Sequence, residues 1–135
     1  MRAHYLTTAP EIWAQRGGNV DAFVDGVGTG GTLMGVGQFL RERNSACQLV
    51  AVEPLESAVM SGSGTLGEHK ITGIGDGFIP PIVDMGKVSR IEAVGSDDAV
   101  RMARRLGREF GLMVGISSGA NVIAALRTAE RLGRD

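Results

Sequence analysis

A cluster of glycines between an apolar segment and an amphipathic one constrains the fold of this chain more than any other feature. Residues 26–32 hold four glycines and two threonines in seven positions. The preceding residues, Val20 to Val27, are typical of a β-strand, and Thr32 to Arg43 carry apolar residues at helical spacing. The cluster therefore predicts a tight turn from a strand into a helix, with successive main-chain N–H groups directed toward one point.

Such a turn is suited to bind a phosphate group. The N-terminal end of a helix carries partial positive charge, and its first N–H groups have no partner inside the helix. Threonine hydroxyls within the cluster can add further donors. The alternative is a glycine-rich turn that binds nothing, because glycine is also an ordinary turn residue.

The rest of the chain predicts strands that alternate with helices. This order favours a three-layer αβα fold with a mostly parallel sheet, in which ligands bind beyond the carboxyl ends of the strands. We expect the glycine-containing segments 26–31, 73–77 and 115–119 to converge there, and residues 61–87 to be mostly irregular. The apolar stripes of the helices, which include Phe110 and Leu126, are expected in the core. The other expected elements are a helix at Pro10–Gln15 capped by Thr7 or Thr8, strands at Gln48–Val52 and Arg90–Val94, a helix capped by Ser96, and a helix from Gly119 to about Leu132.

A second pattern leaves a dinucleotide-binding interpretation open. Gly26, Gly28 and Gly31 match G-x-G-x-x-G between a strand and a helix, and Glu53 ends the next predicted strand. In a dinucleotide site such an acidic residue holds a ribose hydroxyl. The spacing of 27 residues from Gly26 to Glu53 is longer than the usual spacing of about 20.

Composition excludes several other classes of function. A net charge of -1 and an aromatic content of 4% argue against a nucleic-acid partner. The sequence has no apolar run long enough to cross a membrane, and its start does not resemble a signal peptide, so we expect a cytoplasmic protein. Cys47 is expected to be a small buried residue. His4 and His69 lie too far apart in the sequence to suggest a metal site.

Five segments in order along the chain resemble the cysteine synthase (O-acetylserine sulfhydrylase) family of fold-type-II pyridoxal-phosphate enzymes. The resemblance covers nearly the whole chain and implies a partial tryptophan-synthase-β-like fold. The segments are Thr7-Thr8-Ala9-Pro10-Glu11-Ile12-Trp13, Val27-Gly28-Thr29-Gly30-Gly31-Thr32, Val52-Glu53-Pro54, Gly73-Ile74-Gly75-Asp76-Gly77-Phe78-Ile79-Pro80 and Gly115-Ile116-Ser117-Ser118-Gly119-Ala120.

The resemblance also implies roles for particular residues. Ser117 matches the serine that hydrogen-bonds the pyridine nitrogen of the cofactor, although helix capping is the alternative for both Ser117 and Ser118. Asp76 departs from the small residue that is frequent at its position in the family. The cofactor phosphate would be held by Gly28, Thr29, Gly30, Gly31 and Thr32, and the substrate side of the cofactor would be lined by Gly73, Ile74 and Gly75.

The family's catalytic lysine, which binds the cofactor as a Schiff base, has no counterpart here. Lys70 and Lys87 do not match its position, so no catalytic residue is assigned to this chain. We expect residues 1–135 to be a single partial domain, the C-terminal large cofactor-binding domain without the N-terminal half and the extreme C-terminus. Alone, the chain is expected to be inactive and to expose sheet edges and helix faces.

The resemblance implies a whole enzyme that replaces the acetoxy group on the β-carbon of O-acetylserine with sulfide, to give cysteine and acetate. It would use pyridoxal 5'-phosphate and small-molecule substrates, and would form a homodimer. Near alternatives are a cystathionine β-synthase-like or an O-phosphoserine sulfhydrylase-like enzyme. A non-catalytic module that binds the cofactor and an NAD-binding module are the alternatives from other classes.

Overall fold

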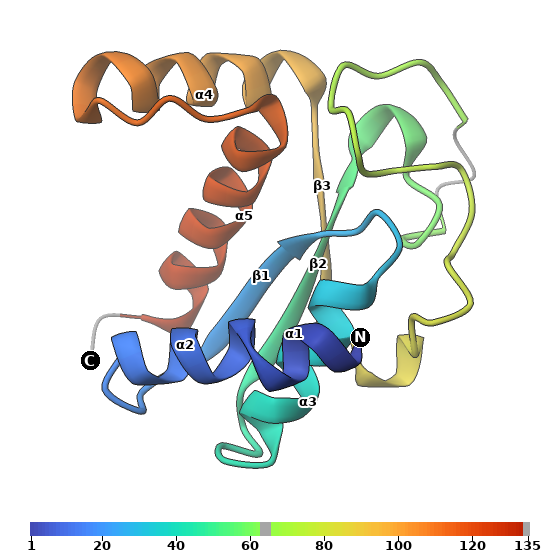
Figure 1. The fold of residues 1–135 in the computed structure, drawn as a ribbon. Helices are drawn as coiled ribbons and strands as arrows, with labels where there is room; N and C mark the ends of the chain where they lie inside the picture. Colours follow the sequence, from blue (N-terminus) through green and yellow to red (C-terminus); the bar gives the residue numbers. More distant parts are fainter. Residues whose placement is uncertain (63–65, 134–135) are drawn as a thin grey trace.

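A three-stranded parallel sheet forms the centre of the molecule, with helices on both of its faces (Figure 1). A computed structural model describes residues 1–62 and 66–133. The elements are α1 (Arg2–Leu6), α2 (Thr8–Gln15), β1 (Ala22–Gly26), α3 (Gly31–Arg41), β2 (Gln48–Pro54), η1 (Leu55–Ser57), η2 (Met85–Lys87), β3 (Arg90–Val94), α4 (Ser96–Phe110) and α5 (Ile116–Leu132).

The strands lie in the order β1-β2-β3, so β2 pairs on both sides. Gly26 of β1 is opposite Val52 of β2, and Pro54 of β2 is opposite Val94 of β3. Because alternate residues of a strand point to opposite faces, β2 contributes to two separate apolar clusters. The carboxyl ends of the three strands therefore meet at one edge of the sheet, as the alternation of strands and helices predicted.

Helices cover the two faces as a three-layer αβα fold requires. Val52 packs with Ala120 and Ala124 of α5, and α4 packs beside α5 on the same face. Leu49 packs with Leu33 of α3 on the opposite face. The short helices α1 and α2 lie on the outer side of α3 (Figure 1). The predicted fold class is confirmed, and the predicted strand at residues 90–94 has the predicted bounds.

Two predicted helix caps are wrong in detail. Thr7 occupies the N-cap position of α2, but its hydroxyl donates to the carbonyl of Ala3, 2.9 Å away, because a helix that was not predicted precedes it. Ser96 is the first residue of α4, and Gly95 is its N-cap. The Ser96 hydroxyl instead accepts the N–H of Lys70 at 2.9 Å, so this side chain ties a loop to the helix.

The last two helices also differ from prediction. Helix α5 begins at Ile116, three residues earlier than expected, so Ser117 and Ser118 lie in its first turn. Phe110 is 65% exposed and Leu126 is 51% exposed, so the prediction that these apolar residues are in the core is wrong. No helix in the described part of the chain is long and apolar enough to span a membrane.

Candidate functional site

The turn between β1 and α3 presents a row of main-chain donors without partners. Gly30 adopts a left-handed conformation with φ of 81° and is the N-cap of α3. Within the described residues, the N–H groups from Gly28 to Thr32 donate no hydrogen bond to a main-chain or side-chain acceptor. Consecutive free N–H groups at the start of a helix form an anion-binding nest. The geometry agrees with the phosphate-binding interpretation of the glycine cluster.

The glycines of this turn also allow a close approach by a second loop. A Cβ atom at Gly28 would lie 2.5 Å from the carbonyl oxygen of Gly73, and a Cβ at Gly30 would clash with the side chain of Val83. The N–H of Gly75 donates to the carbonyl of Val27 at 3.2 Å. The expected meeting of segments 26–31 and 73–77 is therefore confirmed.

A hollow of about 390 Å³ lies beside the turn. Gly28 and Thr29 of the turn line it, and so do Asp76 and Phe78 of the second loop. Its size is within the range of about 300–1,000 Å³ that is usual for small-molecule sites. The remaining lining residues are Pro80, Pro81 and Ile82, so most of the wall is apolar.

A histidine that the sequence did not indicate orients one of the predicted site residues. His4 Nε2 lies 3.3 Å from the hydroxyl of Thr32, and His4 Nδ1 lies 3.0 Å from the hydroxyl of Thr8. When Nε2 carries the proton, it donates to Thr32 and leaves the Thr32 hydroxyl hydrogen free for an anion. No local signal could reveal this contact, because His4 and Thr32 are 28 residues apart.

A carboxylate lies on the strand that leads into the turn. Burial raises the pKa of Asp25 to about 6, and a hydrogen bond from the main chain of Leu33 partly opposes that rise. Leu33 belongs to the first turn of α3, so Asp25 satisfies one of the donors at the start of this helix. At neutral pH the site therefore contains a negative charge next to its row of donors.

Helix α5 runs opposite to the strands and begins near their carboxyl ends (Figure 1), and Ser117 belongs to its first turn. Gly115 is the N-cap of α5, and no side chain caps the helix, so the capping alternative for Ser117 and Ser118 is wrong. One turn later, the buried Oδ1 atom of Asn121 has no partner in the described part of the chain. This oxygen would be 3.2 Å from a Cβ at Gly26.

The segment predicted to line the substrate side is divided between the surface and the core. Gly73 is exposed, and Gly75 contacts Val27, the residue after β1, through the hydrogen bond described above. The side chain of Ile74 is buried against Gly26 and packs in the same apolar cluster as Ala120. Ile74 thus anchors the segment, and only the main chain of this segment can face a ligand.

The dinucleotide interpretation of Glu53 is wrong. Glu53 is 1% exposed, and its two carboxylate oxygens accept the N–H groups of Met60 at 2.8 Å and Ser61 at 3.0 Å. At 1% exposure this carboxylate is not accessible to a ribose hydroxyl, and each of its oxygens already accepts a main-chain N–H. Glu53 stabilises the segment that follows β2.

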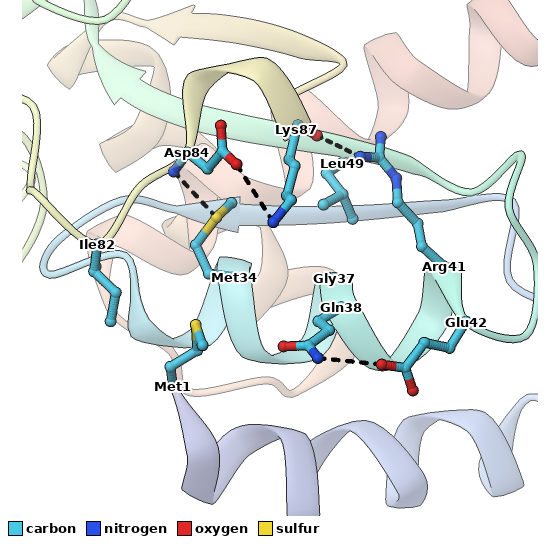
Figure 2. Close-up of a pocket in the computed structure, with 10 residues that line it drawn as sticks. All are labelled: Met1, Met34, Gly37, Gln38, Arg41, Glu42, Leu49, Ile82, Asp84 and Lys87. Atoms are coloured by element: carbon cyan, nitrogen blue, oxygen red, sulfur yellow. Dashed lines mark hydrogen bonds and ion pairs between the residues drawn. The ribbon is translucent and has the colours of Figure 1, made fainter.

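Neither lysine lies at the hollow beside the turn. Lys70 pairs with Asp97 at 2.8 Å, and Lys87 pairs with Asp84 at 3.3 Å. Lys87 borders a different groove of about 520 Å³ that follows α3 (Figure 2). The charged groups of that groove already have partners within the protein: Arg41 donates to the carbonyl of Lys87, Lys87 pairs with Asp84, and Glu42 accepts from the side chain of Gln38. They carry no evident chemistry for the site.

The fold and the turn define a class of protein: a parallel α/β protein with an anion-binding turn at the start of a helix. Comparison with known proteins places the chain within this class. The family described as "Pyridoxal-phosphate dependent enzyme" matches residues 1–135, and the chain therefore belongs to this family. Pyridoxal phosphate is the cofactor of the family.

Individual relatives narrow the comparison. "Cysteine synthase 3" of Caenorhabditis elegans is 52% identical over 129 residues, which are 96% of this chain and 38% of that protein. The crystal structure of O-acetyl serine sulfhydrylase isoform 3 from Entamoeba histolytica matches with a TM-score of 0.90 and 44% identity, over 94% of this chain and 37% of that one. An O-acetylserine dependent cystathionine beta-synthase from Helicobacter pylori matches with a TM-score of 0.90 and 41% identity, over 98% and 42% of the two chains. The chain thus spans about two fifths of the length of these relatives.

Proposed function

We propose that this chain is the phosphate-binding part of an enzyme that makes cysteine from O-acetylserine and sulfide. The observation that carries the proposal is the row of free N–H groups from Gly28 to Thr32 in a chain 52% identical to a cysteine synthase. Residues 1–135 then form part of the larger, C-terminal cofactor-binding domain. The complete enzyme acts on small molecules in the cytoplasm and is a homodimer.

In this proposal the turn holds the cofactor phosphate. The N–H groups of residues 28–32 donate to its oxygens, and the hydroxyl of Thr32, oriented by His4, donates to one more. A doubly charged phosphate suits this arrangement, because main-chain donors and the end of α3 balance its charge without a lysine or arginine. The apolar wall of the neighbouring hollow suits a flat ring.

Ser117 acts on the ring nitrogen of the cofactor. A hydroxyl leaves that nitrogen largely unprotonated, whereas a carboxylate partner would keep it protonated. When bound, pyridoxal phosphate supplies the electron withdrawal that lets acetate leave the β-carbon of O-acetylserine, so that sulfide can add there. The main chain at residues 73–75 lines the substrate side. Both lysines are engaged in ion pairs elsewhere, so covalent attachment of the cofactor is assigned to a part of the enzyme outside these residues.

Cofactor binding tests the proposed role of the turn. We expect the 135-residue chain to bind pyridoxal 5'-phosphate in titration calorimetry, and to bind pyridoxal, which lacks the phosphate, far more weakly. Thr32→Val removes one donor and is expected to weaken binding about tenfold. Thr72→Val, at an exposed threonine near the same loops, is the matched control and should leave the affinity unchanged. Equal binding of pyridoxal and its phosphate would rule out the turn as the phosphate site.

A hybrid enzyme tests the reaction. Residues 1–135 replace the matched region of the Caenorhabditis elegans relative, and the product is assayed with each donor and acceptor. We expect cysteine from O-acetylserine and sulfide. Two other outcomes would contradict the proposed substrates. Cystathionine formed from homocysteine would assign the reaction that the name of the Helicobacter pylori relative gives. A requirement for O-phosphoserine would assign that donor in place of O-acetylserine.

A further inference from the structure

An apolar segment at the corner between α4 and α5 has no cover in this structure. After Phe110 the chain runs back along α4 before α5 begins (Figure 1, orange). Leu112 is 51% exposed, and Met113 is 93% exposed. Together with Val100 and Ala103 of α4 they border a hollow of about 630 Å³. An apolar surface of this kind marks an interaction site more often than a free surface.

The main chain of this segment is also unpaired. The N–H of Leu112 donates to Leu106, and the carbonyl of Gly115 accepts from Ser118. Between them, Met113 and Val114 make no main-chain hydrogen bond within residues 1–62 and 66–133. Unpaired N–H and C=O groups next to apolar side chains can accept an added strand, with the main chain providing affinity and the side-chain pockets providing specificity.

Two positive charges on α4 border the same hollow. Arg104 and Arg108 lie one helical turn apart and form no ion pair with any described residue. On the same helix Arg101 pairs with Asp98, and Arg105 pairs with Glu109. The unpaired guanidinium groups therefore favour a partner with carboxylates beside its apolar residues.

These observations select one occupant. A second copy of the chain in the same position would bring its own pair of guanidinium groups against this pair, which like-charge repulsion disfavours. In the relatives, in contrast, about three fifths of the polypeptide lies outside the region matched here. We propose that the surface formed by Leu112 to Val114, Val100, Ala103 and the two arginines docks an extended apolar segment, flanked by carboxylates, from that remaining part of the family's polypeptide. This docking is independent of the proposed reaction and of phosphate binding.

Co-purification tests the docking surface. The tagged chain is co-expressed with the part of the Caenorhabditis elegans relative outside the matched 129 residues. We expect the two to purify together, and the amides of Met113 and Val114 to gain protection from hydrogen exchange. Met113→Asp, and separately Arg104→Glu with Arg108→Glu, should each lower the recovered partner at least tenfold. Leu55→Asp, at an apolar residue 57% exposed in η1, is the matched control and should have no effect.

Because Met113 is almost fully exposed, we expect Met113→Asp to fold like the wild-type chain. Circular dichroism of each variant checks that the chain still folds. Failure of the wild-type chain to recover the partner overturns the proposal, as does a loss with Leu55→Asp equal to that with Met113→Asp. Sedimentation of the chain alone is the remaining measurement. A dimer that Met113→Asp abolishes would assign the surface to a second copy instead. None of these outcomes depends on whether the chain binds pyridoxal phosphate.

Discussion

At the scale of single residues, Gly30 is placed under two separate constraints. Its φ of 81° is unfavourable for a residue with a side chain, and an added Cβ would meet Val83. We expect Gly30→Ala to lower the free energy of unfolding by about 2–4 kcal/mol, from left-handed strain and overpacking together. Gly17 also has a positive φ, of 60°, but there is open space around it, so Gly17→Ala serves as the control. The control should lose only about 1–2 kcal/mol in urea unfolding; equal losses would contradict the steric argument.

Asp25 predicts a dependence of stability on pH. Its folded pKa of about 6 exceeds the ordinary value of 3.8, so the folded protein binds the proton more tightly than the unfolded chain does. Ionisation therefore costs stability as the pH rises from about 4 through about 6. At pH 7.5 Asp25→Asn should raise the free energy of unfolding by up to about 3 kcal/mol. The gain should shrink as the pH falls toward 4, and a gain that is constant with pH would contradict the assignment.

The sequence predicted the turn itself but not the residues that support it. Gly28 to Thr32 could be recognised because their spacing between a strand and a helix is a local pattern. His4 contacts Thr32 from 28 residues away, and the raised pKa of Asp25 comes from burial, which no local pattern in the sequence reveals. For Glu53 the sequence suggested a binding role that the structure does not support. Its position at the end of a strand resembles a ribose-binding position, but its oxygens accept N–H groups from the segment that follows β2.

At the scale of elements, long-range contacts explain where the predicted boundaries differ. Ser96 has the properties of a cap, yet its N–H donates to Glu56 at 2.8 Å and its hydroxyl accepts from Lys70. Both partners come from the segment between β2 and β3. A preference for capping is local and weak, and a buried tertiary partner overrides it. The bounds of the strands and of α3 were predicted closely, because these elements are buried and their apolar residues therefore follow a regular spacing that the sequence shows.

Removal of the Glu53 carboxylate should loosen the connection after β2. Glu53→Ala removes a buried side chain and leaves the N–H groups of half-buried Met60 and exposed Ser61 without their acceptor. We expect the free energy of unfolding to fall by about 2–4 kcal/mol in urea titration, since each unsatisfied donor costs about 1–3 kcal/mol. Glu68→Ala, at an exposed carboxylate, should change it by less than about 0.5 kcal/mol. A loss no larger than that of the control would show that the two N–H groups find water instead.

At the scale of the whole molecule, the sheet is paired unevenly. Strand β2 has a neighbour on each side, whereas β1 and β3 each have one among the described residues. We expect the amides of Leu49 to Val52 to show the slowest hydrogen exchange, because these residues are buried and bonded on both sides. Amides of β1 and β3 should exchange at least about tenfold faster. Uniform exchange across the three strands would indicate that another surface covers the outer strands.

The contact between Gly28 and Gly73 joins two loops main chain to main chain. With no side chain between them to bend or change rotamer, neither loop can shift alone without breaking the bond from Gly75 to Val27. The turn at residues 28–32 and the segment at residues 73–75 should accordingly move as one rigid unit. A ligand that displaced one would have to carry the other with it.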